Sequence, residues 1–177
     1  MLGVIMQLNI VKILNIHRIR YFLFKRRLKS CGKGVRFSSG IRLYRPKKIS
    51  MGDNVHVGAN CLFSGQGGIN IGNNVSFGPQ VIIWSANHNF EAPERLPYDD
   101  GHICKEVNIE DNTWIGARVT IIPGIRIGEG AVVGMGSVVT KDIPSGAVVG
   151  GNPIKILKYR NMEIYNKLKE EKKFQKL

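Results

Sequence analysis

A period of six residues constrains the fold of this chain more than any other feature. From Ile109 the sequence divides into six consecutive hexapeptides, and each of them begins with Ile or Val. They read IEDNTW, IGARVT, IIPGIR, IGEGAV, VGMGSV and VTKDIP. The pattern also covers Met51–Gly68 and Ile71–His88, and a weaker form covers Phe37–Lys48. A period of six fits neither an α-helix nor a single alternating strand, so the repeat indicates a stack of similar units.

Three hexapeptides make one turn of a three-sided coil, in which each side is a short strand. The aliphatic first residue of each hexapeptide then points inward and stacks on its equivalent one coil away. Strands of adjacent coils pair in parallel at a spacing of about 4.8 Å. Asn, Asp and Gly recur where the corners fall, and these residues tolerate the turn conformations that corners require. The sequence therefore predicts an all-β solenoid, and its periodicity leaves the handedness open.

One polar segment, residues 89–106, interrupts the repeat completely. A long loop inside a compact domain is usually functional. His88 comes directly before the loop, and we predict it to be the last residue of its coil at the mouth of the loop. Because the imidazole pKa lies near neutrality, His88 is a candidate general base. The candidates to orient the imidazole are Asn87, Glu91, Asp99, Asp100 and Glu106.

The segment from Ser85 to Phe90, the loop and the repeats after it resemble the hexapeptide-repeat O-acetyltransferases that act on sugars. The resemblance covers about Ile49 to Leu157 and is best to the branch that decorates capsular, colanic-acid-type and O-antigen polysaccharides. It implies a left-handed parallel β-helix, and an enzyme that transfers an acetyl group from acetyl-CoA to a carbohydrate hydroxyl with His88 as the catalytic base. The basic N-terminal arm does not resemble the acidic lead of the maltose and galactoside acetyltransferases, which disfavours small free sugars as acceptors.

The resemblance also assigns binding residues. Trp84 and Asn87 are expected to contact the acceptor. The residues expected to bind CoA are Trp114, Gly116, Ala117, Gly134, Met135, Thr140, Lys141, Lys155 and Lys158. The family builds its active site between the subunits of a trimer, so a homotrimer is expected.

The charge of the chain is concentrated at one end. The net charge is +13, and residues 1–52 hold 13 Lys and Arg with no Asp or Glu. We expect a basic amphipathic arm over residues 1–34, the β-helix over 35–155 and a C-terminal helix over 156–177. The arm has neither the pattern of a secretory signal nor that of a membrane span. Two interpretations remain open: contact of residues 1–30 with an anionic membrane, and packing on the protein's own body.

Rival functions differ in what they require of the sequence. A zinc carbonic anhydrase on this fold needs three imidazoles, and His17, His56, His88 and His102 lack a closely spaced pair, so no metal is expected. N-acetylation of an amino sugar or drug and a non-enzymatic, membrane-associated scaffold remain as alternatives; no nucleic-acid partner is expected. Three cysteines without a pairing pattern favour a reducing compartment. We therefore expect a cytoplasmic protein, and peripheral contact with the cytoplasmic membrane is one of the two open interpretations of the arm.

Overall fold

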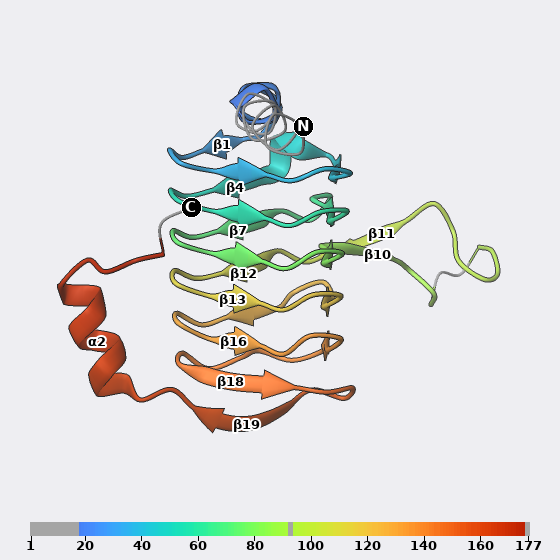
Figure 1. Cartoon of the computed structure of the whole chain (residues 1–177). Helices are drawn as coiled ribbons and strands as arrows, with labels where there is room; N and C mark the ends of the chain where they lie inside the picture. The colour runs from blue at the N-terminus through green and yellow to red at the C-terminus, as the bar shows by residue number, and fades with distance from the viewer. Residues whose placement is uncertain (1–17, 92–93, 176–177) are drawn as a thin grey trace, which may run out of the picture.

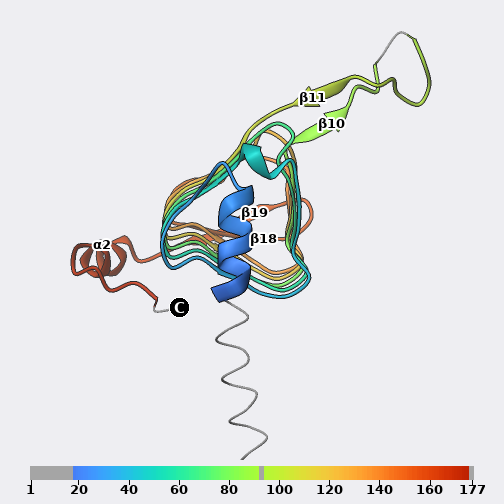
Figure 2. The same cartoon turned by 90° about the horizontal axis from the view of Figure 1, so that it is seen from above.

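The chain folds into a three-sided parallel β-solenoid, which the computed structural model describes for residues 18–91 and 94–175. Figure 1 shows the coils stacked one below another, and Figure 2 shows the triangular cross-section from above. A helix over residues 18–27, here called the cap helix, lies across the first coil. At the other end a strand and helix α2 (Met162–Glu170) complete the chain.

Each face of the prism is one parallel sheet. Sheet A contains β1 (Ser30–Cys31), β4 (Ile49–Met51), β7 (Ile69–Ile71), β12 (Val107–Ile109) and β15 (Arg126–Ile127). Sheet B contains β2 (Arg36–Phe37), β5 (His56–Val57), β8 (Ser76–Phe77), β13 (Trp114–Ile115), β16 (Val132–Val133), β18 (Ala147–Gly150) and the antiparallel β19 (Lys155–Tyr159). Sheet C contains β3 (Arg42–Tyr44), β6 (Leu62–Ser64), β9 (Ile82–Trp84), β14 (Thr120–Ile121) and β17 (Val138–Val139).

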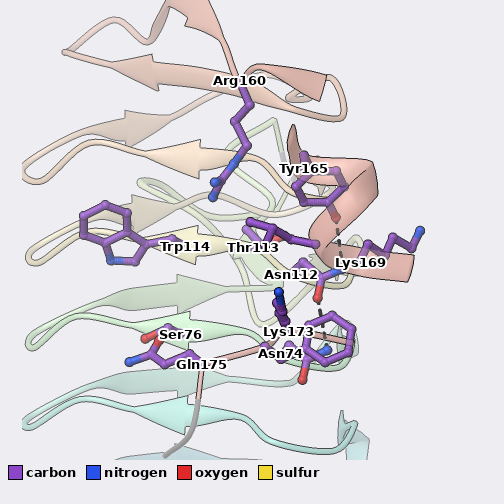
Figure 3. A pocket seen from close by; sticks show the side chains of 12 residues that line it. Asn74, Ser76, Asn112, Thr113, Trp114, Arg160, Tyr165, Lys169, Lys173 and Gln175 are labelled. Atoms are coloured by element: carbon purple, nitrogen blue, oxygen red, sulfur yellow. Dashed lines mark hydrogen bonds between the residues drawn. The ribbon is translucent and has the colours of Figure 1, made fainter. Parts of the chain in front are cut away.

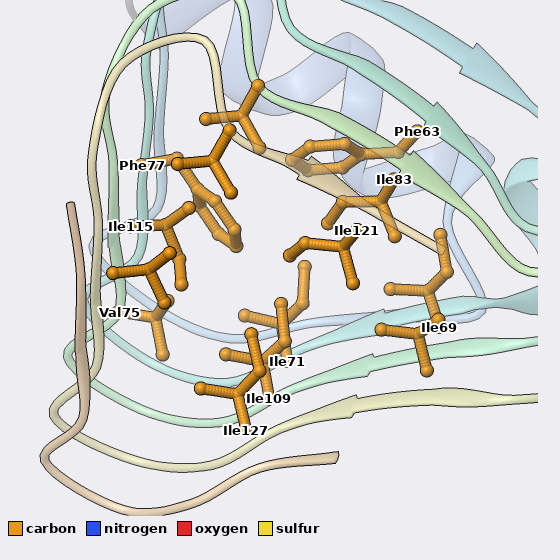
Figure 4. Packing of buried hydrophobic residues seen from close by; sticks show 14 of the residues in the cluster. Phe63, Ile69, Ile71, Val75, Phe77, Ile83, Ile109, Ile115, Ile121 and Ile127 are labelled. Atoms are coloured by element: carbon orange, nitrogen blue, oxygen red, sulfur yellow. The ribbon is translucent and has the colours of Figure 1, made fainter. Parts of the chain in front are cut away.

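The interior is a column of stacked apolar side chains. The first residues of the predicted hexapeptides are buried, except Leu43, which is half-buried. Ile109, Ile115, Ile121 and Ile127 line the column together with Phe63 and Phe77 (Figure 4). The rings of Phe63 and Phe77 lie 5.2 Å apart between centroids. This stacking confirms the predicted solenoid, because burial of the aliphatic residues is the main stabilising contribution to such a fold.

Two of the three corners repeat the same backbone conformation in coil after coil. The corner between sheets A and B places a residue with positive φ in each coil: Gly34, Asn54, Asn74, Asn112, Gly130 and Gly146. Only Gly and, to a lesser extent, Asn adopt this conformation at low cost. The asparagines also form a ladder, since Asn54 Nδ2 donates to Asn74 Oδ1 at 2.9 Å and Asn74 Nδ2 donates to Asn112 Oδ1 at 3.0 Å.

The third corner, between sheets C and A, carries all the variation in coil length. Inward-pointing residues are six apart across the other two corners. Across the third corner the steps are 8, 8, 26, 6 and 4 residues, from Leu43 to Met51, Phe63 to Ile71, Ile83 to Ile109, Ile121 to Ile127, and Val139 to Ile143. The first two steps hold the short helix η1 (Pro46–Lys48) and the turn at Gly65–Gly68, and the third holds the long excursion. The last step shows that the sixth hexapeptide is cut short, because Ile143 bridges to Ile127.

The structure corrects two predicted boundaries. The coils begin with β1 at Ser30, ahead of the expected residue 35, since β1 pairs with β4. The C-terminal helix does not begin near residue 156: Lys155–Tyr159 is strand β19, and α2 starts at Met162 after Asn161, whose side chain accepts a hydrogen bond from the Ile164 amide at 3.1 Å. Alternate apolar residues at 157 and 159 suit a helix and a strand equally well, and the open edge of β18 decides between them.

Candidate functional site

His88 lies on a β-hairpin that projects from the third corner. The hairpin consists of β10 (Ala86–His88) and β11 (His102–Cys104), paired in antiparallel with His88 opposite His102 (Figure 1). This corrects the expectation that His88 ends a coil. The coil ends at the buried Ser85, whose hydroxyl donates to the Ser64 carbonyl at 2.7 Å, and the chain returns where the Lys105 amide donates to the Ser85 carbonyl at 2.9 Å.

A cavity of about 370 Å³ opens at the base of this hairpin. It brings together three residues that the sequence singled out: Trp84, Asn87 and His88. The remaining walls come from the hairpin, from the turn at Gln66 and from the next coil: Ser64, Gln66, Ala86, His102, Thr120, Ile121, Ile122 and Pro123. Trp84 is half-exposed on the outer face of sheet C, so its ring forms an apolar wall that a ligand can contact.

Aromatic side chains hold the His88 ring in place. The Tyr98 ring stacks on it at 3.9 Å between centroids with an interplanar angle of 20°, and the His102 ring lies at 4.6 Å. His102 is fixed in turn, because its Nδ1 lies 3.0 Å from the backbone carbonyl of Asp100. The contacts of Tyr98 and His102 with His88 were not predicted from the sequence. The alternation of a hairpin would place His102 opposite His88, but the register depends on where the loop turns.

None of the five candidates named to orient His88 bonds to its imidazole in the described structure. Nδ1 of His88 is buried and has no hydrogen-bond partner among the described residues. The Asn87 carboxamide accepts from the backbone amide of His88 at 3.1 Å, and Asp100 pairs with Arg95 at 2.6 Å. With Nδ1 buried, Nε2 is the nitrogen of His88 that can exchange a proton with a molecule in the cavity.

The residues expected to bind CoA lie elsewhere on the same chain. Trp114 stands on the outer face of sheet B, 55 % exposed, between Ser76 and Val132 of the neighbouring strands. Gly116 and Ala117 follow at the corner between sheets B and C, and Met135 lies one coil further along. Packing alone requires glycine at position 116, because a Cβ there would lie 2.6 Å from the Met135 amide nitrogen.

The four expected contacts to the CoA phosphates and adenine are exposed on the last coils. Thr140 and Lys141 follow β17, and Lys155 and Lys158 lie on β19 opposite Gly150 and Val148. None of the predicted CoA residues lines the cavity at His88. The structure therefore separates the residues at the His88 cavity from the expected CoA residues; of the latter, only Thr140 and Lys141 lie at the same corner as the hairpin, on a later coil.

A second cavity, of about 540 Å³, lies between α2 and sheet B beside Trp114 (Figure 3). Its walls include side chains that the sequence did not single out: Arg160, Tyr165, Lys169 and Lys173. Tyr165 ties α2 to the asparagine ladder, since Asn112 Nδ2 donates to its hydroxyl at 2.9 Å and the hydroxyl donates to Glu129 Oε1 at 2.8 Å.

Charge and burial shift the pKa values of Glu129, Tyr165 and Lys169 in this cluster, and the hydrogen bond to Glu129 raises that of Lys169. Lys169 Nζ lies 2.6 Å from Glu129 Oε1, and its hydrogen bond lowers the pKa of the Glu129 carboxyl. Burial, together with the bond to Glu129, raises the pKa of Tyr165 to about 12. Tyr165 therefore keeps its hydroxyl proton and remains a hydrogen-bond donor to Glu129 over the whole physiological pH range.

The described residues contain neither a group of three His, Cys, Asp or Glu that could hold a metal ion nor a helix long and apolar enough to cross a membrane. Of the histidines considered as ligands, His17 lies outside the described residues. His56 is on sheet B near Ser38, away from the neighbouring rings of His88 and His102.

With this fold and hairpin, the chain belongs to the hexapeptide-repeat acetyltransferases, whose solenoid is a left-handed parallel β-helix. The family described as hexapeptide repeat of succinyl-transferase matches residues 48–77 and 106–141. An acetyltransferase of Vibrio cholerae O1 biovar eltor that contains hexapeptide repeats, solved with acetyl coenzyme A, is 31 % identical with a TM-score of 0.73; the match covers 80 % of this chain and 76 % of that one.

Two sugar acetyltransferases are similar as well. The structure of a maltose O-acetyltransferase from Clostridium difficile 630 is 35 % identical with a TM-score of 0.68, over 79 % of this chain and 74 % of that one. The galactoside O-acetyltransferase of Lactococcus lactis is 40 % identical over 107 residues, which are 60 % of this chain. The chain matches about half, 51 %, of the length of that relative.

Proposed function

We propose that this protein transfers the acetyl group of acetyl-CoA to a hydroxyl of a carbohydrate, with His88 as the general base. The observation that carries the proposal is the cavity at the hairpin, where the His88 ring is clamped by Tyr98 and His102 beside the exposed face of Trp84. An aromatic wall next to polar groups suits a sugar, which has apolar faces and hydroxyl edges.

The chemistry follows from one imidazole. Nε2 of His88 takes the proton of the acceptor hydroxyl while the hydroxyl oxygen attacks the thioester carbonyl. The tetrahedral intermediate then expels the CoA thiolate, which receives the proton from the imidazolium. Stabilising the oxyanion of the intermediate requires N–H donors near the cavity, and backbone amides can supply them.

The donor would lie along the expected CoA residues. An exposed Trp114, the close-packed Gly116 and Gly134 and the cations Lys141 and Lys155 suit a long thiol ester with an anionic end. Ala117, Met135, Thr140 and Lys158 belong to the same proposed groove.

The acceptor we favour is an intermediate of a surface polysaccharide of the capsular or colanic-acid type. The acceptor cavity is open, and the basic cap helix replaces the acidic lead expected of enzymes for small free sugars. An N-acetyltransferase would use the same cavity with an amine in place of the hydroxyl, so acceptor assays separate the two.

The active enzyme would be a homotrimer with each site shared by two subunits. Two observations support this: His88 and Trp114 lie in different cavities of one chain, and the hairpin carries the exposed apolar side chains Phe90, Leu96 and Ile103 away from its own body. A hairpin of this kind needs a neighbouring surface to cover it, and the exposed Trp114 and Met135 offer one.

The test of the chemistry is release of the CoA thiol with sugar nucleotides, lipid-linked glycans, polysaccharides and amino sugars as acceptors. His88→Ala should lower kcat by about 10²–10⁴-fold, while circular dichroism and gel filtration remain as in the wild type. A folded His88→Ala protein that keeps full turnover would rule out the mechanism.

The test of the shared site is a mixture of His88→Ala and Trp114→Ala proteins, each inactive alone. If subunits are mixed at random in a 1:1 ratio, about one quarter of the sites combine an intact His88 from one chain with an intact Trp114 from another. Activity should then recover to about that fraction. A mixture that stays inactive although its subunits exchange would show that each site is built from one chain.

A further inference from the structure

One face of the cap helix is packed on the solenoid. Tyr21 and Phe24 are half-buried and Leu28 is buried. The Phe24 ring lies 4.6 Å from that of Phe37, and the Tyr21 hydroxyl donates to the Gly32 carbonyl at 3.0 Å. These residues recur at the spacing of one helix face, so the cap helix closes the open end of the apolar column.

The opposite face of the same helix is apolar too, and it is exposed. Ile19, Phe22 and Leu23 are 59 %, 53 % and 57 % exposed. At 100° per residue they lie on the side of the helix opposite to the one that packs on the first coil. The cap helix itself lies at the outer end of the solenoid (Figures 1 and 2). An amphipathic helix with one buried face needs no second apolar face for folding.

The exposed strip, Ile19, Phe22 and Leu23, is surrounded by cations. Arg18 and Lys25 lie on one side of it and Arg27 on the other, and the Arg26 guanidinium lies 4.1 Å from the centre of the Phe22 ring. Residues 18–52 hold 12 Lys and Arg and no Asp or Glu. None of these described cations forms a salt bridge with a described carboxylate.

We propose that the cap helix docks the protein on an anionic lipid surface, with Ile19, Phe22 and Leu23 inserted among the acyl chains and the flanking cations at the headgroups. An apolar strip bordered by Lys and Arg is the pattern of a helix that lies in a membrane interface. A nucleic acid would use the cations and leave the strip exposed to water. A protein partner would need a large acidic surface to match a segment without carboxylates.

The consequence concerns the acceptor and rests on the proposed function. The hairpin leaves sheet C after β9, two strand spacings from β3, so it lies about 10 Å from the first coil. The cap helix, which lies between the first coil and the lipid, adds its diameter of about 10 Å. The cavity at His88 would therefore lie about 20 Å from the lipid surface. A glycan carried on a lipid reaches that height without leaving the membrane, so the acceptor class would be lipid-linked.

The test measures co-sedimentation of the full-length protein with vesicles of phosphatidylcholine alone and of phosphatidylcholine with 30 mol% phosphatidylglycerol (about one lipid in three anionic). Phe22→Ser/Leu23→Ser should weaken binding to the anionic vesicles about tenfold or more. Arg18→Gln/Arg26→Gln should weaken it about fivefold per cation. The control, Ile164→Ser/Leu168→Ser, removes exposed apolar residues of α2 and should bind as the wild type does.

Three outcomes would overturn the proposal. They are absence of wild-type binding to anionic vesicles, equal binding by the wild type and Phe22→Ser/Leu23→Ser, and salt-sensitive binding to duplex DNA that exceeds binding to the vesicles. Equal binding would assign the contact to another segment, such as residues 1–17, which lie outside the described structure.

A kinetic comparison separates this proposal from the proposed function. Phe22→Ser/Leu23→Ser should raise the apparent KM for an acceptor embedded in vesicles at least tenfold and leave turnover of a soluble acceptor unchanged. If His88→Ala abolishes turnover but the apparent KM does not change in Phe22→Ser/Leu23→Ser, only docking is refuted. If vesicle binding behaves as expected and no acceptor is acetylated, only the enzymatic proposal fails.

Discussion

Replacing an asparagine of the ladder lowers the free energy of unfolding in two ways: hydrogen bonds are lost, and the new residue must adopt the left-handed conformation. Asn74 has a φ of 55° and makes two ladder bonds, one to Asn54 and one to Asn112. Asn74→Ala loses both bonds, at about 1 kcal/mol each. It also places a Cβ in the left-handed region without the local hydrogen bonding of Asn, at about 1–2 kcal/mol. The expected loss in the free energy of unfolding is about 3–4 kcal/mol.

Asn74→Gly separates these terms. It loses the same two bonds, but Gly adopts a positive φ freely, and its only further cost is the greater entropy of the unfolded chain, about 0.5–1 kcal/mol. The expected loss is about 2.5–3 kcal/mol. The glycine variant should therefore be more stable than the alanine variant, although it has the smaller side chain.

The matched control is Asn70, which lies in the extended strand β7 and donates to Asn108 Oδ1 at 2.9 Å. Here no left-handed conformation is involved, so Asn70→Gly should be less stable than Asn70→Ala by about 0.5–1 kcal/mol. Denaturant unfolding followed by circular dichroism measures all four variants. If alanine is more stable than glycine at both positions, the left-handed corner does not contribute as argued.

Three further predictions concern the hairpin, α2 and the thiols. Tyr98→Ala removes the ring stacked on His88 and should lower kcat about tenfold with little change in the KM for acetyl-CoA, whereas Tyr98→Phe should behave as the wild type; equal steady-state rates for all three would refute a positioning role. The lowered pKa of Glu129 means that its contribution to the attachment of α2 is present above the unfolded-state pKa of about 4.3 and is lost as the pH falls through this value and below it. Hydrogen exchange of α2 amides, corrected for the intrinsic rate, should therefore accelerate below about pH 4, and a rate independent of pH would contradict this. Burial raises the pKa of Cys61 to about 11, so iodoacetamide at pH 8 should modify the exposed Cys104 and reach Cys61 only after unfolding, as peptide mass spectrometry can verify.

The solenoid was predictable because its core residues are local in sequence. Each hexapeptide from Ile109 onward begins with Ile or Val, so the inward-pointing residues could be identified from the spacing alone, as at Ile115 and Ile121. The end of the repeat was less predictable. The antiparallel return of Lys155–Tyr159 depends on the unpaired edge of β18, which no local pattern records.

The candidate site was predictable only in part, because its geometry arises from long-range contacts. The position of His88 before the interruption pointed to the cavity. The clamp by Tyr98 and His102 could not be foreseen, since it depends on the register of a hairpin whose turn has no strong sequence signal. The grouping of Trp114 with Arg160 and Tyr165 likewise depends on how α2 returns along sheet B.

The uneven third corner has a consequence for how such a protein can diversify. Steps of 8, 26, 6 and 4 residues occur at this corner, and the strands on either side of it keep their register. A segment exchanged here alters one rim of the molecule and leaves the stacked interior as it was. Grafting the hairpin of a relative between Ser85 and Lys105 should therefore transfer acceptor preference as a module. A single residue inserted at the asparagine corner would instead disrupt every ladder bond next to it.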